Sequence, residues 1–216
     1  MSDAPATIRG SSAGLDEPVL RETSVSEGEF LTFFDPAYSA QVAAWIRTEL
    51  ELNWLAPGTP WPLTAAKVAA WGEERRERFL LWNGRDDAPI GYAELNEMPK
   101  TRDQMWIGHF VLDPACRGRS WGVRFAQALI ARAFVERHAT DVLLVVIPEN
   151  LRAIRCYQRA GMINLGQERK HFKSTGREYL FNRMGISRGR FRMLSGQGRM
   201  PVGPLSIREI PACAAR

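Results

Sequence analysis

The segment 110–123, which reads FVLDPACRGRSWGV, constrains the fold of this 216-residue chain more than any other segment. Its first three residues are apolar and stop at Asp113-Pro114, as a strand does where proline removes a hydrogen-bond donor. A turn that contains Gly118 and two arginines follows, and a helical pattern of apolar residues starts at about Ser120. The segment therefore predicts a strand, a basic turn and a helix in immediate succession.

This succession has the chemistry of an anion-binding site. Gly118 and Gly122 let the backbone come close to a ligand. The N–H groups of the first helical turn point at that ligand, and the helix dipole favours negative charge there. Arg117 and Arg119 add positive charge, so we expect a pyrophosphate. The sequence has neither a Gly-x4-Gly-Lys-Ser/Thr loop nor a Gly-x-Gly-x-x-Gly after its first strand, which excludes two familiar nucleotide-binding loops.

The remaining periodicity predicts a mixed α/β domain. Strands are expected at about 30–34, 78–83, 89–96, 104–112, 142–147, 162–168 and 177–184, and helices at about 37–52, 64–77, 120–137 and 150–160. Residues 142–147 are continuously apolar, which is typical of a strand in a sheet covered on both faces. Thr64 is expected to cap one helix, and Gly161 to end another.

Composition divides the chain into three parts. Residues 1–28 are polar and are interpreted as a flexible leader, residues 29–186 as one domain, and residues 187–216 as a basic tail containing glycine and proline, solvated or loosely docked. No stretch approaches the roughly 18 apolar residues of a membrane-spanning helix. The N-terminus also lacks the apolar run of a secretion signal. We therefore expect a cytoplasmic protein with no membrane partner.

Charge and cysteine content narrow the classes of function. Lys and Arg number 29 against 24 Asp and Glu, a net charge of +5 that suits an anionic partner. Cys116, Cys156 and Cys213 are too scattered for a disulfide framework or a zinc site, so they are interpreted as reduced structural thiols. The three histidines show no metal-ligand spacing either, so no metal is expected.

A second motif stands about 28 residues after Gly122, beyond a predicted helix and strand. Residues 150–162 read NLRAIRCYQRAGM. Together with RGRSWG at 117–122, this motif resembles the GNAT superfamily of acyl-CoA-dependent N-acetyltransferases, whose signature is Arg/Gln-x-x-Gly-x-Gly/Ala followed by Asn-x-x-Ala-x-x-x-Tyr-x-x-x-Gly-Phe. Met162 replaces the phenylalanine, and Ser120 replaces the first glycine of Gly-x-Gly. Serine is small and can cap a helix, so we expect the loop to survive. The resemblance covers residues 29–186.

The resemblance implies a mostly antiparallel sheet with helices on both faces, in which strands four and five splay apart to admit acetyl-CoA. Backbone groups of Phe110, Val111 and Leu112 would pair with the pantetheine amides like an added strand. Asn150 would contact the cofactor arm, cap its own helix, or do both. The pyrophosphate would lie beside Arg117, at Gly118, Arg119, Ser120, Trp121, Gly122 and Val123.

The implied reaction is acyl transfer from a thioester to an amine. Tyr157 matches the family's usual proton donor to the departing thiolate, although such a ring can also serve packing alone. The general base is open. The substrate-facing positions of the fourth strand hold Trp106 and Gly108, which cannot take a proton. Glu94 on the preceding strand is the candidate base. His109 is a less favoured candidate, because strand alternation turns it to the opposite face. Proton removal by a water chain, or capture of an amine that is already neutral, is the alternative.

No feature identifies the acceptor, which is expected to be an amine of a small molecule or a protein. Its pocket is expected between the loop that joins the first two helices and the hairpin at 97–104, with Trp54 and Trp61 able to stack on a cation. Two rival functions are an acyl-CoA sensor without turnover and nucleic-acid binding through the arginine-rich tail, of which nucleic acid is the less expected partner. A monomer or a homodimer is expected.

Overall fold

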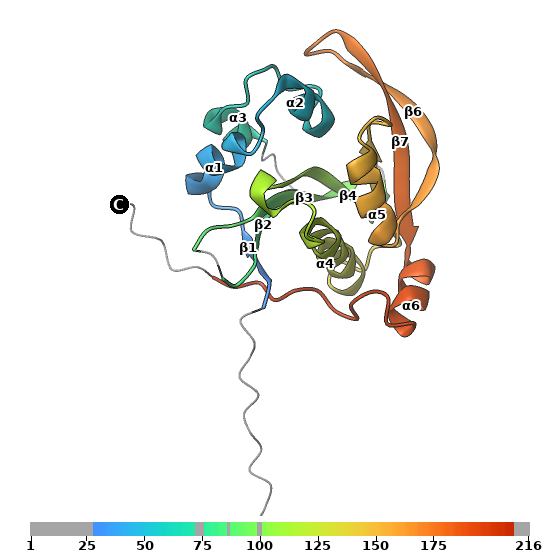
Figure 1. Cartoon of the computed structure of the whole chain (residues 1–216). Helices are drawn as coiled ribbons and strands as arrows, with labels where there is room; N and C mark the ends of the chain where they lie inside the picture. The colour runs from blue at the N-terminus through green and yellow to red at the C-terminus, as the bar shows by residue number, and fades with distance from the viewer. Residues whose placement is uncertain (1–27, 72–75, 86, 99–100, 210–216) are drawn as a thin grey trace, which may run out of the picture.

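The computed structural model describes residues 28–71, 76–85, 87–98 and 101–209, which fold around a seven-stranded sheet (Figure 1). The strands lie in the order β1-β2-β3-β4-β5-β7-β6, and all neighbours run antiparallel except the parallel pair β4 and β5. Their bounds are β1 (Phe30–Phe33), β2 (Arg76–Trp82), β3 (Gly91–Met98), β4 (Thr101–Leu112), β5 (Asp141–Val146), β6 (Ile163–Phe172) and β7 (Arg177–Ser187). The mixed, mostly antiparallel sheet expected from the sequence is confirmed.

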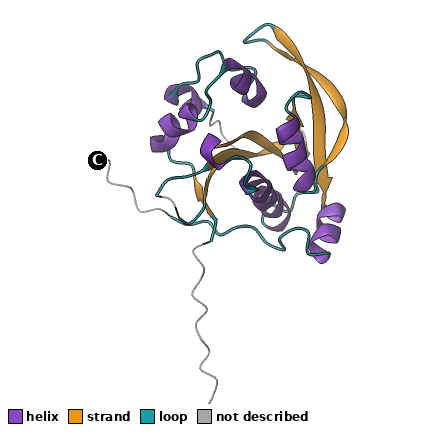
Figure 2. Ribbon diagram, viewed as in Figure 1, coloured by secondary structure: helices purple, strands orange, loops and turns teal. Residues whose placement is uncertain are grey.

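Helices cover both faces of this sheet, as Figure 2 shows. They are α1 (Ser39–Ala44), α2 (Glu49–Leu55), α3 (Ala65–Ala70), α4 (Trp121–Val135), α5 (Leu151–Arg159) and α6 (Arg188–Gly196), with short 3-10 turns η1 (Pro36–Tyr38) and η2 (Pro114–Cys116). Neighbouring residues of one strand reach different layers, because strand side chains alternate between faces. Phe79 of β2 lies in the core under α4, whereas Leu80 lies in the core under α1 and α3.

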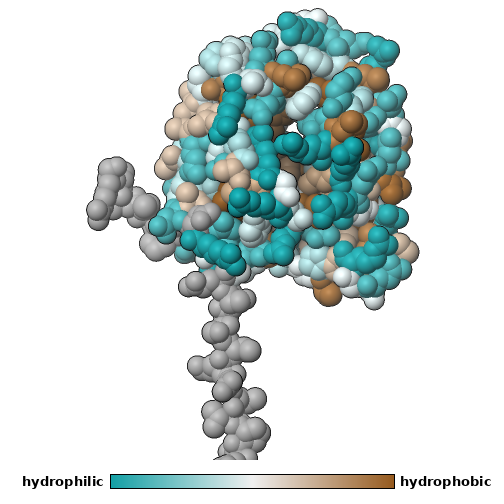
Figure 3. Space-filling model, viewed as in Figure 1, coloured by the Kyte–Doolittle hydropathy of each residue, from teal (hydrophilic) through white to brown (hydrophobic). Residues whose placement is uncertain are grey.

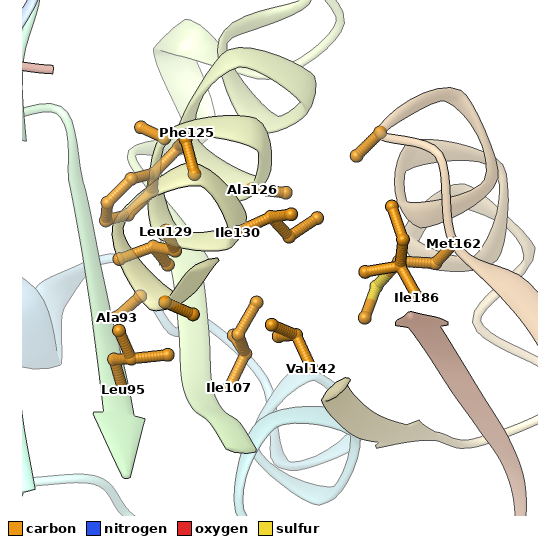
Figure 4. Close-up of a cluster of buried hydrophobic side chains, with 14 of the residues drawn as sticks. Ala93, Leu95, Ile107, Phe125, Ala126, Leu129, Ile130, Val142, Met162 and Ile186 are labelled. Atoms are coloured by element: carbon orange, nitrogen blue, oxygen red, sulfur yellow. The ribbon is translucent and has the colours of Figure 1, made fainter. Parts of the chain in front are cut away.

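The core under α4 joins most of the elements. Figure 4 shows side chains of α4 facing those of β3 and β4, with Phe125, Leu129 and Ile130 on one side and Ala93, Leu95 and Ile107 on the other. Hydrophilic side chains dominate the face of the molecule in Figure 3, with apolar ones scattered among them. Among the described residues, no helix is long and apolar enough to cross a membrane.

The two parallel strands separate soon after they meet. β4 and β5 pair only where residues 104–106 face residues 141–143. Beyond that register, the carboxyl-terminal half of β4 and the end of β5 have no ladder between them. The expected splay of the fourth and fifth strands is therefore present, and it leaves backbone groups of both strands free to meet a ligand.

Two expected boundaries near the N-terminal half are wrong. The single helix expected over 37–52 is broken: α1 ends at Ala44 and α2 begins at Glu49, where the Thr48 hydroxyl accepts a hydrogen bond from the Glu51 N–H at 3.1 Å. Thr64 caps α3 as expected, with its hydroxyl 3.3 Å from the Lys67 nitrogen. That helix ends before residue 77, however, because Arg76 already pairs with β3.

The expected boundary between domain and tail at residue 186 is also wrong. The Ser187 hydroxyl accepts a hydrogen bond from the Arg190 N–H and begins α6. Phe191 and Leu194 of that helix, and Met200 after it, are buried in the core under α4. The arginines of this segment thus surround a small apolar set that packs on the domain. The high arginine content of this segment led to its interpretation as a tail.

The chain continues from α6 to the edge of the sheet. Ile207 forms a parallel bridge with Leu31 of β1, through hydrogen bonds of 3.0 Å from the Leu31 nitrogen to Ser206 and 2.9 Å from the Arg208 nitrogen back to Leu31. The Arg208 guanidinium lies 4.2 Å from the ring centroid of Phe30. The predicted leader, up to residue 27, and residues 210–216 lie outside the described residues.

Candidate active site

A cavity of about 1340 Å³ opens where β4 and β5 separate. Residues 106–112 of β4 form one wall, and residues 144–146 of β5 with much of α5 form another. The turn before α4 and the loop after α2 also contribute to the wall. One space therefore joins the predicted anion cradle to the region predicted for an acceptor.

The anion cradle has the backbone shape of a glycine-rich turn. Gly118 has φ +82°, and Ser120 has φ +65°, both in the left-handed region. The Ser120 side chain makes no capping hydrogen bond with α4, and its hydroxyl instead accepts one from Arg159 at 3.2 Å. The loop keeps its turn with serine, as expected, but helix capping is not the reason, because Ser120 makes no capping hydrogen bond.

Gly122 lets α4 and α5 approach closely at the cradle. A Cβ atom at this position would stand 3.0 Å from the Cys156 sulfur and 3.4 Å from a methyl of Leu112. A larger side chain would therefore press on α5 and narrow the cavity. Cys156 itself lines the cavity, and burial raises the pKa of its thiol to about 11 against the opposing charge of Arg159.

Arg117 ties the cradle to α2 and to the end of α1. Its guanidinium donates to the Glu51 carboxylate at 2.6 Å and to the Trp45 carbonyl at 3.0 Å, while its Nε donates to the Leu112 carbonyl at 3.2 Å. These contacts give Arg117 a structural function in addition to any cofactor contact. The Arg117 side chain also lines the cavity.

The cavity brings together most of the predicted cofactor residues. Arg119 and Trp121 are not among its described lining residues: Arg119 is exposed, and the ring of Trp121 lies under the Arg124 guanidinium at 5.5 Å. Asn150 lines the cavity and also caps α5, with its side-chain oxygen 3.2 Å from the Ala153 nitrogen. The other predicted cofactor residues in its wall are Phe110, Val111, Leu112, Arg117, Gly118, Ser120, Gly122 and Val123.

Tyr157 reaches the cavity from α5, although only 7% of it is exposed. Its ring packs edge-on against Phe110, with 5.7 Å between centroids. Burial raises the pKa of its phenol far above the usual range, so the hydroxyl keeps its proton at neutral pH. None of the described residues hydrogen-bonds to that hydroxyl, which leaves the proton available to a ligand in the cavity.

Glu94 also lines the cavity, but its carboxylate is already engaged. One oxygen accepts hydrogen bonds from the Tyr92 hydroxyl at 2.9 Å and from His109 Nδ1 at 2.8 Å, and the other accepts one from the Asn96 amide at 3.3 Å. Burial alone would raise its pKa, but the hydrogen bonds from His109, Tyr92 and Asn96 outweigh burial and hold the pKa below its ordinary value. The predicted role of Glu94 as the base is therefore weakened.

His109 lies in the cavity wall, so the expectation that it faces away is wrong. Tyr92 pairs with Val111, and Glu94 pairs with Gly108, so two residues of β4 oppose one residue of β3. This β-bulge adds a residue and reverses the alternation before it. His109 takes φ +39°, and its ring stacks on Trp71 at 4.0 Å between centroids. Gly108 was the signal for the bulge, since a lone glycine in a strand often marks one.

The acceptor end of the cavity is built partly as expected. The loop after α2 and the end of β3 contribute Trp54, Pro57, Glu97 and Met98, but Trp61 is 43% exposed and is not in the wall. Sequence reasoning missed the contribution of β6 and β7, which supply Lys170, Phe172 and Phe181. The Lys170 ammonium lies 4.6 Å from the ring centroid of Trp106. No local motif links these strands to the cavity.

Comparisons with known proteins agree with this architecture. The acetyltransferase (GNAT) family model matches residues 46–162, which is more than half of the chain. The aminoglycoside N(6')-acetyltransferase type 1 proteins of Klebsiella pneumoniae and Serratia marcescens are each 30% identical to the chain over 88 residues. These matches cover 36% of this chain and 44% of each relative, so the chain spans less than half the length of the curated relatives it matches.

Solved structures share the fold at low sequence identity. The aminoglycoside acetyltransferase AAC(6')-Ib in complex with coenzyme A and kanamycin has a TM-score of 0.61 and 20% identity, over 78% of this chain and 99% of that one. Spermidine N-acetyltransferase from Vibrio cholerae, in complex with coenzyme A and spermine, has a TM-score of 0.63 and 15% identity, over 76% and 98%. With the family model matched across the cradle, the cavity and α5, the chain belongs to the acetyltransferase (GNAT) family.

Proposed function

We propose that the protein transfers the acetyl group of acetyl-CoA to a primary amine. The observation that carries this proposal is the single cavity at the β4–β5 splay, which holds the anion cradle, a protonated buried tyrosine and a carboxylate–histidine pair in one space. An acyl transfer needs a cofactor site, a proton donor and a way to neutralise the amine, and all three have candidates here.

The cofactor half of the cavity suits acetyl-CoA. The first-turn N–H groups of α4 and the turn at Gly118 are suited to the pyrophosphate, because helix N-termini attract anions. Residues 110–112 pair with β3 on one edge only, and their other edge has no ladder with β5. That edge is suited to the pantetheine amides, because an open strand edge can pair with an added strand. Asn150 and α5 form the opposite wall. Acetyl-CoA supplies the activated acyl group as a thioester.

Tyr157 is proposed as the acid that protonates the departing sulfur. Its phenol lies in the cavity wall, is held by Phe110 and keeps its proton at neutral pH. A donor of this kind acts mainly in the transition state, when negative charge develops on the sulfur. Removing it should therefore affect the rate more than it affects the affinity for the cofactor.

The relatives indicate a broad class of acceptor, the polyamines. The curated relatives are named for aminoglycosides, and one structural neighbour was solved with spermine, so both classes carry several amines. The Lys170 ammonium already lies over Trp106, so the acceptor end offers the aromatic rings of Trp54 and Phe172 and the carboxylate of Glu97. These groups suit an aliphatic amine with a second positive charge, which aromatic faces and carboxylates both attract.

The test is an acetyl-CoA consumption assay against a panel containing kanamycin, spermidine, amino acids and peptide N-termini. Turnover of at least one amine is expected. Tyr157→Phe should lower kcat about 10²-fold, with acetyl-CoA affinity unchanged. Tyr179→Phe, which removes a phenol hydroxyl outside the cavity, is the matched control. Acetyl-CoA binding without turnover of any panel amine would favour the sensor function instead, and equal kcat values for Tyr157→Phe and wild type would remove Tyr157 from the mechanism.

A further inference from the structure

The proposed reaction requires that an ammonium acceptor lose a proton before its nitrogen can attack. Glu94 is poorly placed to take that proton directly. Only 1% of Glu94 is exposed, and both of its carboxylate oxygens already accept hydrogen bonds from Tyr92, Asn96 and His109. A carboxylate whose pKa is held low by such donors is a weak base. Glu94 is therefore better suited to hold His109 in place than to accept a proton itself.

The contact with Glu94 fixes the proton on one nitrogen of His109. An ionised carboxylate only accepts hydrogen bonds, so the 2.8 Å contact requires that Nδ1 carry the hydrogen. The other nitrogen, Nε2, is then an acceptor in the neutral ring. The ring is also fixed in plane, because Trp71 stacks on it with an angle of 6° between the planes. With its side chain 21% exposed in the cavity wall, His109 is held as an oriented proton acceptor.

Asn96 places a second acceptor beside this histidine. Its amide nitrogen must be the atom that faces Glu94, since its oxygen would be repelled by the carboxylate. The Asn96 oxygen then points elsewhere, and it is buried with no hydrogen-bond partner among the described residues. A buried unpaired carbonyl oxygen is costly, so such a group is expected to meet a donor when a ligand binds. Asn96 also lines the cavity.

Gly108 keeps the approach to these groups open. A Cβ atom at this position would lie 3.2 Å from the Asn96 amide nitrogen and 3.3 Å from a Glu94 oxygen. Any larger side chain on this part of β4 would therefore cover the carboxylate and the amide. The bulge that follows Gly108 turns His109 toward the same space. These contacts converge on a small polar site in a wall that is otherwise largely apolar.

We propose that His109 is the general base of the acetyl transfer, that Glu94 positions it, and that the Asn96 oxygen accepts a second N–H of the acceptor amine. This inference rests on the proposed function and names the residues that prepare its nucleophile. His109 Nε2 takes a proton from the ammonium, whose nitrogen keeps the electron pair. Glu94 stabilises the resulting imidazolium through Nδ1, as a carboxylate does in hydrolase triads.

The acetyl group then passes from sulfur to nitrogen with all protons and electrons accounted for. The freed amine attacks the thioester carbonyl, so a C–N bond forms and the carbonyl electrons move to its oxygen. On collapse, the electron pair on oxygen re-forms the C=O bond and the C–S bond breaks. The sulfur leaves with the C–S electron pair and takes the Tyr157 proton. The new amide nitrogen gives its extra proton to the Tyr157 oxygen, and His109 releases its own to water. An ammonium and an acetyl thioester thus give an amide, a thiol and one proton.

The experiment compares His109→Gln with wild type on the panel amine turned over fastest, starting with spermidine and kanamycin. Glutamine can keep the hydrogen bond to Glu94 and much of the packing on Trp71, but it cannot take the proton. We expect kcat/KM for the amine to fall about 10²-fold or more, with thermal stability and acetyl-CoA affinity near those of wild type. His171→Gln, an exposed histidine on β6, is the matched control and should keep wild-type values.

Glu94 and Asn96 are tested by readouts that separate their roles. Glu94→Gln should lower kcat/KM about tenfold, and the double variant with His109→Gln should be no slower than His109→Gln alone, because Glu94 acts through the histidine. A merely structural Glu94 would add its own loss. Asn96→Ala should raise KM for the amine about tenfold, as expected for one lost buried hydrogen bond, and should leave KM for acetyl-CoA unchanged.

A spectroscopic measurement checks the arrangement without any substrate. The ring-nitrogen resonances of His109 in ¹⁵N-labelled protein should show a hydrogen on Nδ1, and they should shift in Glu94→Gln. Hydrogen on Nε2 in the neutral ring, or full activity of His109→Gln, would overturn this inference while the proposed function stands. Absence of turnover by the wild-type protein on every panel amine would overturn the proposed function and this inference together.

Discussion

Ser120 is the residue at which this chain departs from the family signature, and its backbone predicts the effect of restoring glycine. At φ +65° and ψ +1°, Ser120 occupies the left-handed region, which costs a non-glycine residue about 1–2 kcal/mol. One exposed hydrogen bond from Arg159 to its hydroxyl stabilises the folded protein by about 0.5 kcal/mol. Glycine also adds about 0.5 kcal/mol of freedom to the unfolded chain. The net gain in unfolding free energy for Ser120→Gly is therefore about 0.5 kcal/mol.

The contrast with alanine makes this prediction sharper. Ser120→Ala keeps the strained backbone and loses the hydrogen bond, so its unfolding free energy should fall by about 0.5 kcal/mol. The two variants should then differ by about 1 kcal/mol, or about 2–4 °C in Tm for a chain of this length. Thermal and urea unfolding, each with and without acetyl-CoA, measure the order Gly, Ser, Ala. The reasoning fails if alanine is as stable as glycine, because no left-handed strain would then be present to relieve.

Three further outcomes follow from packing and burial. Phe191→Ala should lower the unfolding free energy by about 3–5 kcal/mol and should lower Tm, whereas Met193→Ala, on the exposed side of α6, should change both little. Wild-type stability of Phe191→Ala would contradict the docking of α6 on the domain. Gly122→Glu should abolish the rise in Tm that acetyl-CoA causes, with Gly196→Glu, whose Cβ would meet open space, as the control; an unchanged rise would place the pyrophosphate elsewhere. Because its pKa is raised to about 11, Cys156 should be about one part in 10³ thiolate at pH 8. Alkylation, followed by mass spectrometry, should therefore be slow there and rise about tenfold per pH unit; rapid labelling at pH 8 would contradict the burial.

The cofactor half of the site could be predicted from the sequence because it is local. Strand, turn and helix follow one another within residues 110–123, and the proline, the glycines and the apolar stripe predict each of them. The turn and the start of α4 formed as expected. What a single sequence could not give was the conformation of one residue, since serine at position 120 is compatible with either a cap or a left-handed turn.

The acceptor half could not be predicted, because distant segments build it. Lys170 and Phe181 come from strands that meet the loop after α2 only in the folded chain, where the Ser174 hydroxyl donates to the Gly58 carbonyl at 2.8 Å. The docking of α6 had a local signal that charge obscured. Ser187 as a cap, followed by Phe191 and Leu194 three residues apart, is a short amphipathic helix even among arginines.

The bulge in β4 accounts for the most consequential error and also for much of the site. Strand alternation assumes that each residue of β4 faces one residue of β3, and under that assumption His109 shares the face of Ile107 under α4. With one extra residue opposite Ala93, His109 turns to the cavity while Phe110 keeps the α4 face and packs on Tyr157. The bulge lies just beyond Trp106, where β4 loses its ladder with β5, and bulges bend the strands that carry them. One inserted residue therefore coincides with the opening between the strands, brings the histidine to Glu94 and leaves Phe110 to hold the proposed acid. An engineered β4 without that residue would be expected to lose both the proton acceptor and the orientation of its neighbour, even with every side chain of the motif retained.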